Sequence, residues 1–204
     1  MYLEFKIGTS RQGVEVDEKN LMGVLEPNKL PPGPCGEEAV KNALAAPIGA
    51  RPLRQIVHKG ETVAIVTSDI TRPMPTHAVM PALLDELYAG GVAPEDITLV
   101  FALGSHRGHS EEEKRHLAGE RAWAEIHCVD LDAADCVHIG TPSRGTPVDI
   151  DRRVARADRR ICLGNIEYHY FAGYSGGAKA IMPGVSTRAA IQANHSAMVL
   201  PEAR

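Results

Sequence analysis

Hydrophobic and polar positions alternate with a period of two at the start of the chain. In residues 2–7, Leu, Phe and Ile lie between Tyr, Glu and Lys, a pattern typical of a half-buried β-strand. We expect a turn at residues 10–13, which are Ser, Arg, Gln and Gly, and a second strand that resumes at residues 14–16. Residues 1–30 are therefore predicted to form a β-hairpin.

The pattern becomes helical after a cluster of prolines and glycines at residues 30–36. From residue 37, the apolar positions recur at i, i+1, i+4 and i+5, as Ala39, Val40, Ala43 and Leu44. A short helix is expected here, at the start of a body that spans residues 35–204.

From residue 61 the pattern changes again, to continuous apolar runs. These occupy residues 62–67, 97–103 and 161–163. Strands that are apolar on both faces belong to buried, mostly parallel sheets. The runs therefore predict a parallel sheet that is covered on both sides.

The segments between the runs have helical spacing. Met80, Leu83, Leu84 and Leu87 fall on one helix face ahead of two glycines, and Ser110 with Glu113 has the spacing of a capping box. Strands that alternate with helices indicate crossover units. The predicted fold class is α/β, a mostly parallel sheet with helices on both faces, preceded by the N-terminal hairpin.

Composition narrows the possible partners. The 204 residues carry 22 Lys and Arg against 26 Asp and Glu, a net charge of -4, which favours neither nucleic acid nor an anionic membrane. The four cysteines form no CxxC pair, and the chain has no apolar leader or long apolar run. We expect a cytoplasmic protein that acts on a small molecule. Because no closing element follows the last apolar stretch, residues 1–204 are expected to belong to a longer protein.

Polar clusters follow each apolar run, where parallel sheets bind their ligands. They occupy residues 67–75, 104–109 and 164–179. Each cluster, taken singly, has a structural explanation, such as a helix cap, a histidine bonded to a carbonyl or a glycine turn. His106 and His109 form an HxxH pair, but they lie in an expected loop and do not by themselves indicate a metal site. Their common position favours one shared site.

The glycine turn at residues 173–180 resembles a phosphate cradle. Ser175, Gly176 and Gly177 would present backbone N–H groups to an anion, and Lys179 would add a positive charge. A magnesium-dependent P-loop is disfavoured, because its motif requires Gly at position 178 and a hydroxyl at position 180, both of which are Ala here. A lysine after such a turn could alternatively be a covalent anchor.

His195 lies in a predicted helix with Thr187 as its N-cap. It shares a face with Ile191 and Met198, so it is either a histidine at the edge of the core or a metal ligand. No HxxxH, HExxH or paired-carboxylate motif accompanies it, and a zinc site built from protein ligands alone is not supported.

Four segments together resemble a known family. These are SDITRP (68–73), GSHRGHSEEE (104–113), EYHYFAGYSGGAKAIMPG (167–184) and the pair Asn194-His195. In this order they resemble the N-terminal domain of the nickel-dependent lactate racemase family, from about residue 60 to the end of the chain. The 167–184 segment is the most specific of the four.

The resemblance implies a nickel-pincer nucleotide, a pyridinium mononucleotide whose ring carbon and two sulfur-bearing arms hold nickel. It implies that Lys179 is joined to this cofactor through a thioamide and that His195 completes the nickel coordination. His106 and His169 would be the general acid and base, and Asp69 and Arg72 would line the cofactor pocket together with the glycine turn.

The resemblance also implies the reaction. A histidine would remove the hydroxyl proton of a 2-hydroxy acid while a hydride moves to the cofactor, and return of the hydride to the other face would invert the centre. Family members are about twice as long, with a C-terminal domain that closes over the cofactor. We therefore expect the isolated chain to be inactive, and the cofactor can be absent from it. Lactate, malate, aryl-lactates and sugar acids are all candidate substrates.

Two other functions compete with a racemase or epimerase. A non-catalytic phosphate- or nucleotide-binding module would keep the glycine turn, but it would not need His106, His169, Lys179 and His195. A nicotinamide-dependent hydride enzyme is disfavoured because no GxGxxG follows an apolar strand. If the site assignments are correct, one cleft should be lined by Asp69, Arg72, His106, His169, Lys179 and His195.

Overall fold

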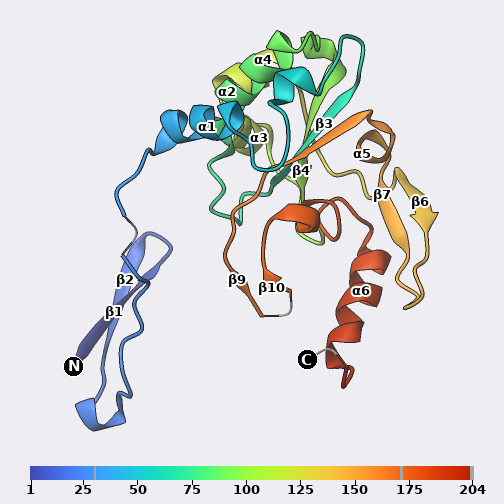
Figure 1. Cartoon of the computed structure of the whole chain (residues 1–204). Helices are drawn as coiled ribbons and strands as arrows, with labels where there is room; N and C mark the ends of the chain where they lie inside the picture. The colour runs from blue at the N-terminus through green and yellow to red at the C-terminus, as the bar shows by residue number, and fades with distance from the viewer. Residues whose placement is uncertain (30, 171, 203–204) are drawn as a thin grey trace. The chain divides into compact units, whose positions relative to one another are not determined.

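A computed structural model describes residues 1–29, 31–170 and 172–202. Leu30, in the expected hairpin segment, and Phe171, in the 167–184 motif, lie outside the described residues, as do residues 203–204. The chain divides into two compact units, residues 1–33 and 34–204, and each is described by itself (Figure 1).

The first unit contains an antiparallel hairpin, so the predicted N-terminal hairpin is confirmed as an element, although its strands end at Glu15 and do not extend over residues 1–30. It consists of strands β1 (Tyr2–Ile7) and β2 (Ser10–Glu15), followed by the short helix η1 (Glu18–Asn20). The predicted turn at residues 10–13 is wrong, because the chain turns at residues 8–9. Gly8 has φ +58°, whereas Gly13 lies inside β2, where a Cβ would fall within 2 Å of the Tyr2 hydroxyl. Gly13 is therefore a strand residue, paired with Glu4 of β1, and does not form the turn.

The second unit contains the predicted parallel sheet, which is confirmed. It begins with α1 (Gly36–Ala45) and η2 (Leu53–Gln55). The four strands pair in parallel in the order β5-β4-β3-β8 and span β3 (Val63–Ser68), β4 (Ile97–Ala102), β5 (His127–Asp130) and β8 (Arg159–Cys162). The strand order reverses at β3, because β4 and β5 extend the sheet on one side and β8 returns to the other.

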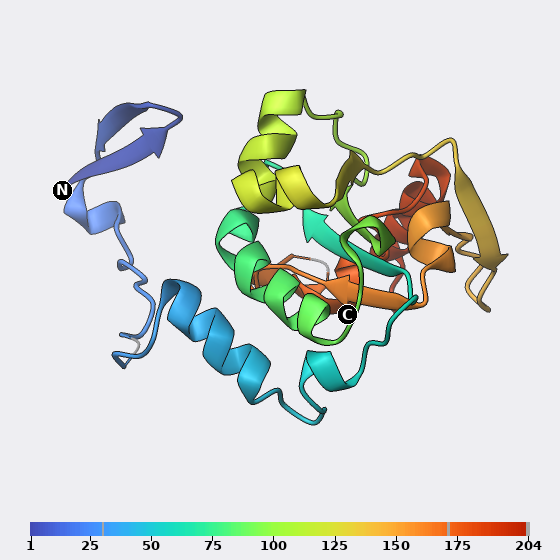
Figure 2. The same ribbon diagram turned by 90° about the horizontal axis from the view of Figure 1, so that it is seen from above.

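Both faces of the sheet are buried. Val63 and Ile65 belong to the core cluster on one face, and Ala64 and Val66 belong to the cluster on the other, since successive side chains of a strand point to opposite faces. The first face is covered by α2 (Thr76–Ala89), α3 (Glu111–Ala118) and α4 (Glu120–Glu125), with η3 (Pro94–Asp96) leading into β4 (Figure 2). The second is covered by α5 (Arg152–Arg156) and the hairpin of β6 (Cys136–Gly140) and β7 (Val148–Asp151).

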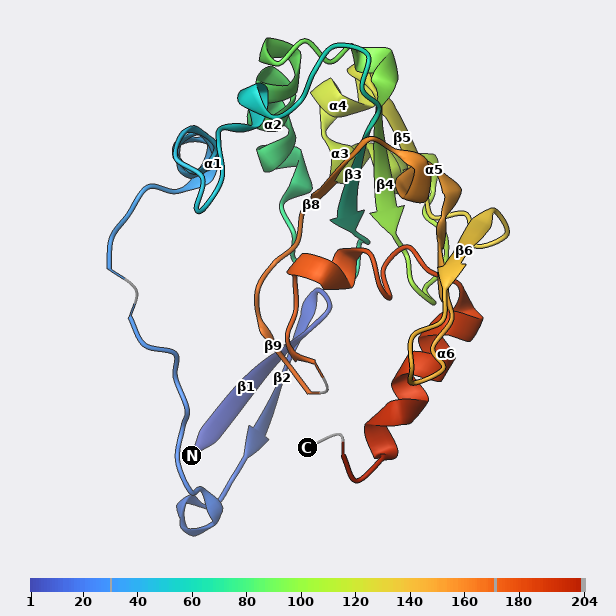
Figure 3. The same cartoon turned by 45° about the vertical axis from the view of Figure 1, so that its right-hand side comes forward.

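The chain after β8 lies beyond the carboxyl ends of the central strands (Figure 3). It forms the two-stranded pair β9 (Tyr168–His169) and β10 (Gly173–Tyr174), then η4 (Gly177–Ala180), α6 (Arg188–Ser196) and η5 (Ala197–Val199). Two predicted caps are confirmed. Ser110 and Glu113 form the capping box of α3, and the Thr187 hydroxyl accepts from the Ala190 amide at the start of α6.

No helix among residues 1–29, 31–170 and 172–202 has the length and apolar character needed to cross a membrane.

Candidate active site

A cavity of about 570 Å³ opens at the carboxyl ends of the central strands. It is lined by Ser68 at the end of β3, Ala102 at the end of β4 and Leu163 directly after β8. Parallel strands deliver the residues that follow them to one edge of a sheet, and the reversal of strand order at β3 leaves a crevice there. Its volume is in the range of small-molecule and cofactor sites.

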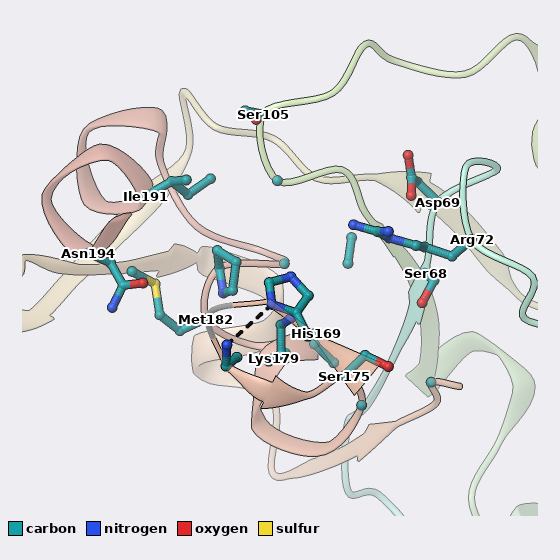
Figure 4. A pocket seen from close by; sticks show the side chains of 18 of the residues that line it. Ser68, Asp69, Arg72, Ser105, His169, Ser175, Lys179, Met182, Ile191 and Asn194 are labelled. Atoms are coloured by element: carbon teal, nitrogen blue, oxygen red, sulfur yellow. Dashed lines mark hydrogen bonds between the residues drawn. The ribbon is translucent and has the colours of Figure 1, made fainter. Parts of the chain in front are cut away.

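The structure brings almost all the sequence-predicted site residues to this cavity. Its lining includes Asp69, Arg72, His106, His169, Ser175, Gly176, Lys179 and His195 (Figure 4). Gly177, which was grouped with the glycine turn, is not among the lining residues. Segments almost 130 residues apart in sequence therefore share one cavity.

The Asp69 carboxylate orients the His106 ring. Asp69 is almost fully buried, and its Oδ2 lies 2.7 Å from His106 Nδ1, while the Thr71 hydroxyl donates to its Oδ1 at 2.9 Å. A carboxylate only accepts, so Nδ1 carries the proton and Nε2 of the neutral ring keeps its lone pair. His106 is therefore prepared to accept a proton at Nε2.

The second histidine has the opposite tautomer. The Ala172 amide donates to His169 Nδ1 at 3.2 Å, so the proton of the neutral ring is on Nε2. Burial lowers the pKa of His169 below its usual value, and the positive charges of Lys179 and Arg72, with that of His195 when it is protonated, lower it further. His169 is thus held as a neutral ring that carries its proton on Nε2, and it would have to be the imidazolium before it could supply a proton.

Lys179 points toward His169 in the cavity (Figure 4). Burial lowers the pKa of its amine, and so does the positive charge of Arg72, while Glu167 opposes the shift. The turn before it is held by a close backbone approach, because a Cβ on Gly176, whose φ is +82°, would lie 3.2 Å from the Asn165 carbonyl oxygen. Gly176 therefore fixes the path of the chain into η4.

His195 lies on α6 with one ring nitrogen available to a ligand. Its Nδ1 lies 2.8 Å from the Ile191 carbonyl oxygen, which only accepts, so Nε2 is unprotonated in the neutral ring. The helix is tied to β7, because the Thr187 hydroxyl donates to the Asp149 carboxylate at 3.0 Å. A carbonyl-bound imidazole on an anchored helix has the arrangement usual for a metal-binding histidine.

Among the described residues, no group of three His, Cys, Asp or Glu side chains could hold a metal ion. His195 offers the cavity one imidazole, a donor that nickel accepts.

Sequence reasoning did not select two charged residues of the cavity. Arg144 reaches the lining from the turn between β6 and β7, and Glu167 lies just before β9. No local motif marks Arg144, because its position depends on how the hairpin folds against the sheet. Glu167 lies inside the 167–184 segment, and that segment could have pointed to it.

Comparisons with known proteins agree on one family. Residues 7–204 match the family described as the lactate racemase N-terminal domain. Two similar proteins are lactate racemases, one from Thermoanaerobacterium thermosaccharolyticum, 31% identical over 198 residues, and one from Lactiplantibacillus plantarum, 35% identical over 202 residues. The alignments cover 95% and 93% of this chain and 46% of each relative. The chain thus spans about half the length of these relatives.

Solved structures give the same picture. The lactate racemase apoprotein from T. thermosaccharolyticum superposes with a TM-score of 0.80 at 31% identity, over 100% of this chain and 49% of that one. A protein from Thermotoga maritima superposes with a TM-score of 0.65 at 23% identity, over 84% of this chain and 43% of that one, which indicates a shared fold.

Proposed function

Because the chain belongs to the lactate racemase N-terminal domain family, we propose that it is the cofactor-bearing part of a nickel-pincer-nucleotide-dependent racemase or epimerase of 2-hydroxy acids. One observation carries the proposal: two histidines of opposite tautomer share a cavity with a lysine of lowered pKa and with His195, whose Nε2 is unprotonated. A non-catalytic binding module would have no need of this combination.

Lys179 and His195 would hold the cofactor. The lowered pKa of Lys179 increases the fraction of the side chain that is a neutral amine, the form that a covalent link requires. The Nε2 lone pair of His195 would bind the nickel, with Ser175 and Gly176 lining the same cavity. When bound, the cofactor would accept a hydride from the substrate carbon and return it.

His106 and His169 would move the proton of the substrate hydroxyl. In the arrangement seen here, His106 Nε2 can accept that proton, and the Asp69 carboxylate 2.7 Å from Nδ1 stabilises the imidazolium that results. His169 would supply a proton to the oxygen from its imidazolium form and return to the neutral ring seen here. Racemisation in both directions requires the two rings to exchange roles, which suits the near-neutral pKa of histidine.

The remaining parts of the proposal concern the whole enzyme. A C-terminal domain would close over the cavity and contribute to substrate binding, so the isolated chain would be inactive. Arg72 and Arg144 would offer positive charge to the substrate carboxylate or the cofactor phosphate. All four cysteines are free thiols, which supports a reducing cytoplasmic location.

Intact-mass measurement of the full-length enzyme, produced alongside the cofactor-building enzymes, tests the proposal. The unaltered chain should carry a covalent adduct, and Lys179→Arg should carry none, because Arg keeps the charge but lacks the primary amine. Lys41→Arg is the matched control, since Lys41 is exposed and paired with Glu37, and it should keep the adduct. An unmodified wild-type chain, or an adduct that survives in Lys179→Arg, would contradict the assignment.

A further inference from the structure

Another histidine, His109, lies in the loop between β4 and α3 and is not among the residues that line the cavity. Its side chain is only 1% exposed, and its ring packs edge-on against Phe101 with the centroids 5.5 Å apart. A buried imidazole is costly unless its polar atoms have partners. The partners of His109 therefore show what the ring does.

Both ring nitrogens of His109 are engaged. Nδ1 lies 2.6 Å from Asp130 Oδ1, and the His109 amide donates to Asp130 Oδ2 at 2.8 Å. The backbone amide of Ile70 donates to Nε2 at 3.1 Å. Since Nε2 accepts, the proton must be on Nδ1, where it is donated to the carboxylate. These contacts fix one tautomer and leave no nitrogen for proton transfer.

His109 and its two partners follow or end three neighbouring strands of the sheet. Ile70 follows β3, His109 ends the loop after β4, and Asp130 is the last residue of β5. Ile70 is also the residue next to Asp69, whose carboxylate orients His106. A chain of hydrogen bonds thus runs from Asp130 through His109 to the peptide that carries Asp69.

We propose that His109 is a positioning residue, which holds the 69–72 segment through the Ile70 amide and thereby sets the Asp69–His106 pair. The two histidines of the HxxH sequence then have different roles: His106 exchanges a proton, and His109 keeps one tautomer and fixes the geometry. This inference rests on the proposed role of His106 as a proton-transfer group.

Two substitutions separate the contacts of His109. The amide of His109→Asn can donate to Asp130 but is too short to reach Ile70. The amide oxygen of His109→Gln can occupy the place of Nε2 and accept from Ile70, but it gives up the ring contact with Asp130. Both remove the ring from Phe101, so a loss of packing alone should affect them equally.

The first readout is hydrogen exchange and histidine ¹⁵N spectra of the chain itself. In His109→Asn the Ile70 amide should exchange about 5- to 10-fold faster, and the His106 Nδ1 resonance should move as its contact with Asp69 loosens. His109→Gln should retain both features. Equal changes in the two variants, or an Ile70 amide unaffected by Asn, would overturn the proposal.

The unaltered protein gives a test that does not depend on how well the variants fold. Its ¹⁵N spectrum should show His109 protonated at Nδ1 and unprotonated at Nε2. An Nε2–H tautomer would be incompatible with a donor at Ile70 and would overturn the proposal directly.

The second readout is turnover by the cofactor-loaded, full-length enzyme. There, His109→Asn should lower kcat by about 10- to 100-fold, as a small misplacement of reacting groups does, with a smaller change in KM, and His109→Gln should restore most of the loss. Equal kcat in both variants would overturn the positioning role. If no form of the enzyme racemises a hydroxy acid, the proposed function fails, while the exchange and tautomer measurements still decide the structural role of His109.

Discussion

The substitution Gly184→Ala should destabilise the α/β unit markedly, because Gly184 lies where the backbone leaves no room for a side chain. A Cβ built there would be 2.2 Å from the Ala180 carbonyl oxygen and 3.0 Å from the Ala102 Cβ. The first contact is with main chain, so no change of rotamer can relieve it. The turn that follows η4 would have to move.

That movement would break two backbone hydrogen bonds. The Gly184 amide donates to the Lys179 carbonyl at 3.0 Å, and the Gly184 carbonyl accepts from the Gly104 amide at 2.9 Å. Overpacking typically costs about 1–3 kcal/mol and each lost hydrogen bond about 1 kcal/mol. With partial relaxation we expect a loss of about 3 kcal/mol, which corresponds to a fall in Tm of about 6–12 °C for a domain of this size.

Urea and thermal unfolding of the two variants Gly184→Ala and Gly140→Ala would measure this effect. Gly140 lies in β6, its φ is not positive, and a Cβ there would meet nothing within 4 Å. The control should therefore change the free energy of unfolding by no more than about 0.5 kcal/mol. If Gly184→Ala proved as stable as Gly140→Ala, the close contact between Gly184 and the Ala180 carbonyl at this wall of the cavity would be refuted.

Two further predictions concern the histidines of the cavity. In the full-length enzyme, His195→Ala should lower nickel content and activity together, whereas His106→Ala and His169→Ala should keep nickel and lose about 10²–10⁴-fold in turnover. Metal analysis and racemisation assays of the three variants measure both quantities. If His106→Ala or His169→Ala lost nickel in proportion to activity, the division of roles would be refuted. Because the pKa of His169 is lowered on folding, the unfolded chain binds its proton first as the pH falls. The contribution of neutral His169 to the free energy of unfolding should therefore be complete above pH 6.5. It should decline as the pH falls toward the pKa of His169 in the folded chain. His169→Gln should remove this part of the decline in stability at low pH, as measured by urea unfolding at a series of pH values. If the variant and the unaltered chain had the same pH profile, this contribution of His169 would be refuted.

The sequence determined the elements that depend on local chemistry. The apolar runs at residues 62–67 and 97–103 identified the two central strands, because strands that are buried on both faces consist mostly of apolar residues. The Ser110 and Thr187 caps were readable since a cap joins a side chain to a backbone amide three residues away. The polar residues after each run placed the candidate site at one edge of the sheet, as the geometry of parallel strands requires.

Only the tertiary structure decided what depends on distant partners. Strands β5, β6 and β7 are short and half-polar, and they take their conformation from the neighbours they pair with. The hairpin turn was misplaced because Gly13 suits a turn by itself, and only its pairing with Glu4 shows that it lies in a strand. The tautomers of His106, His109 and His195 were equally unreadable, because each is set by the carboxylate, amide or carbonyl that the fold brings to the ring. Sequence thus supplied the chemical groups, and packing between distant segments determined which nitrogen of each ring carries the proton.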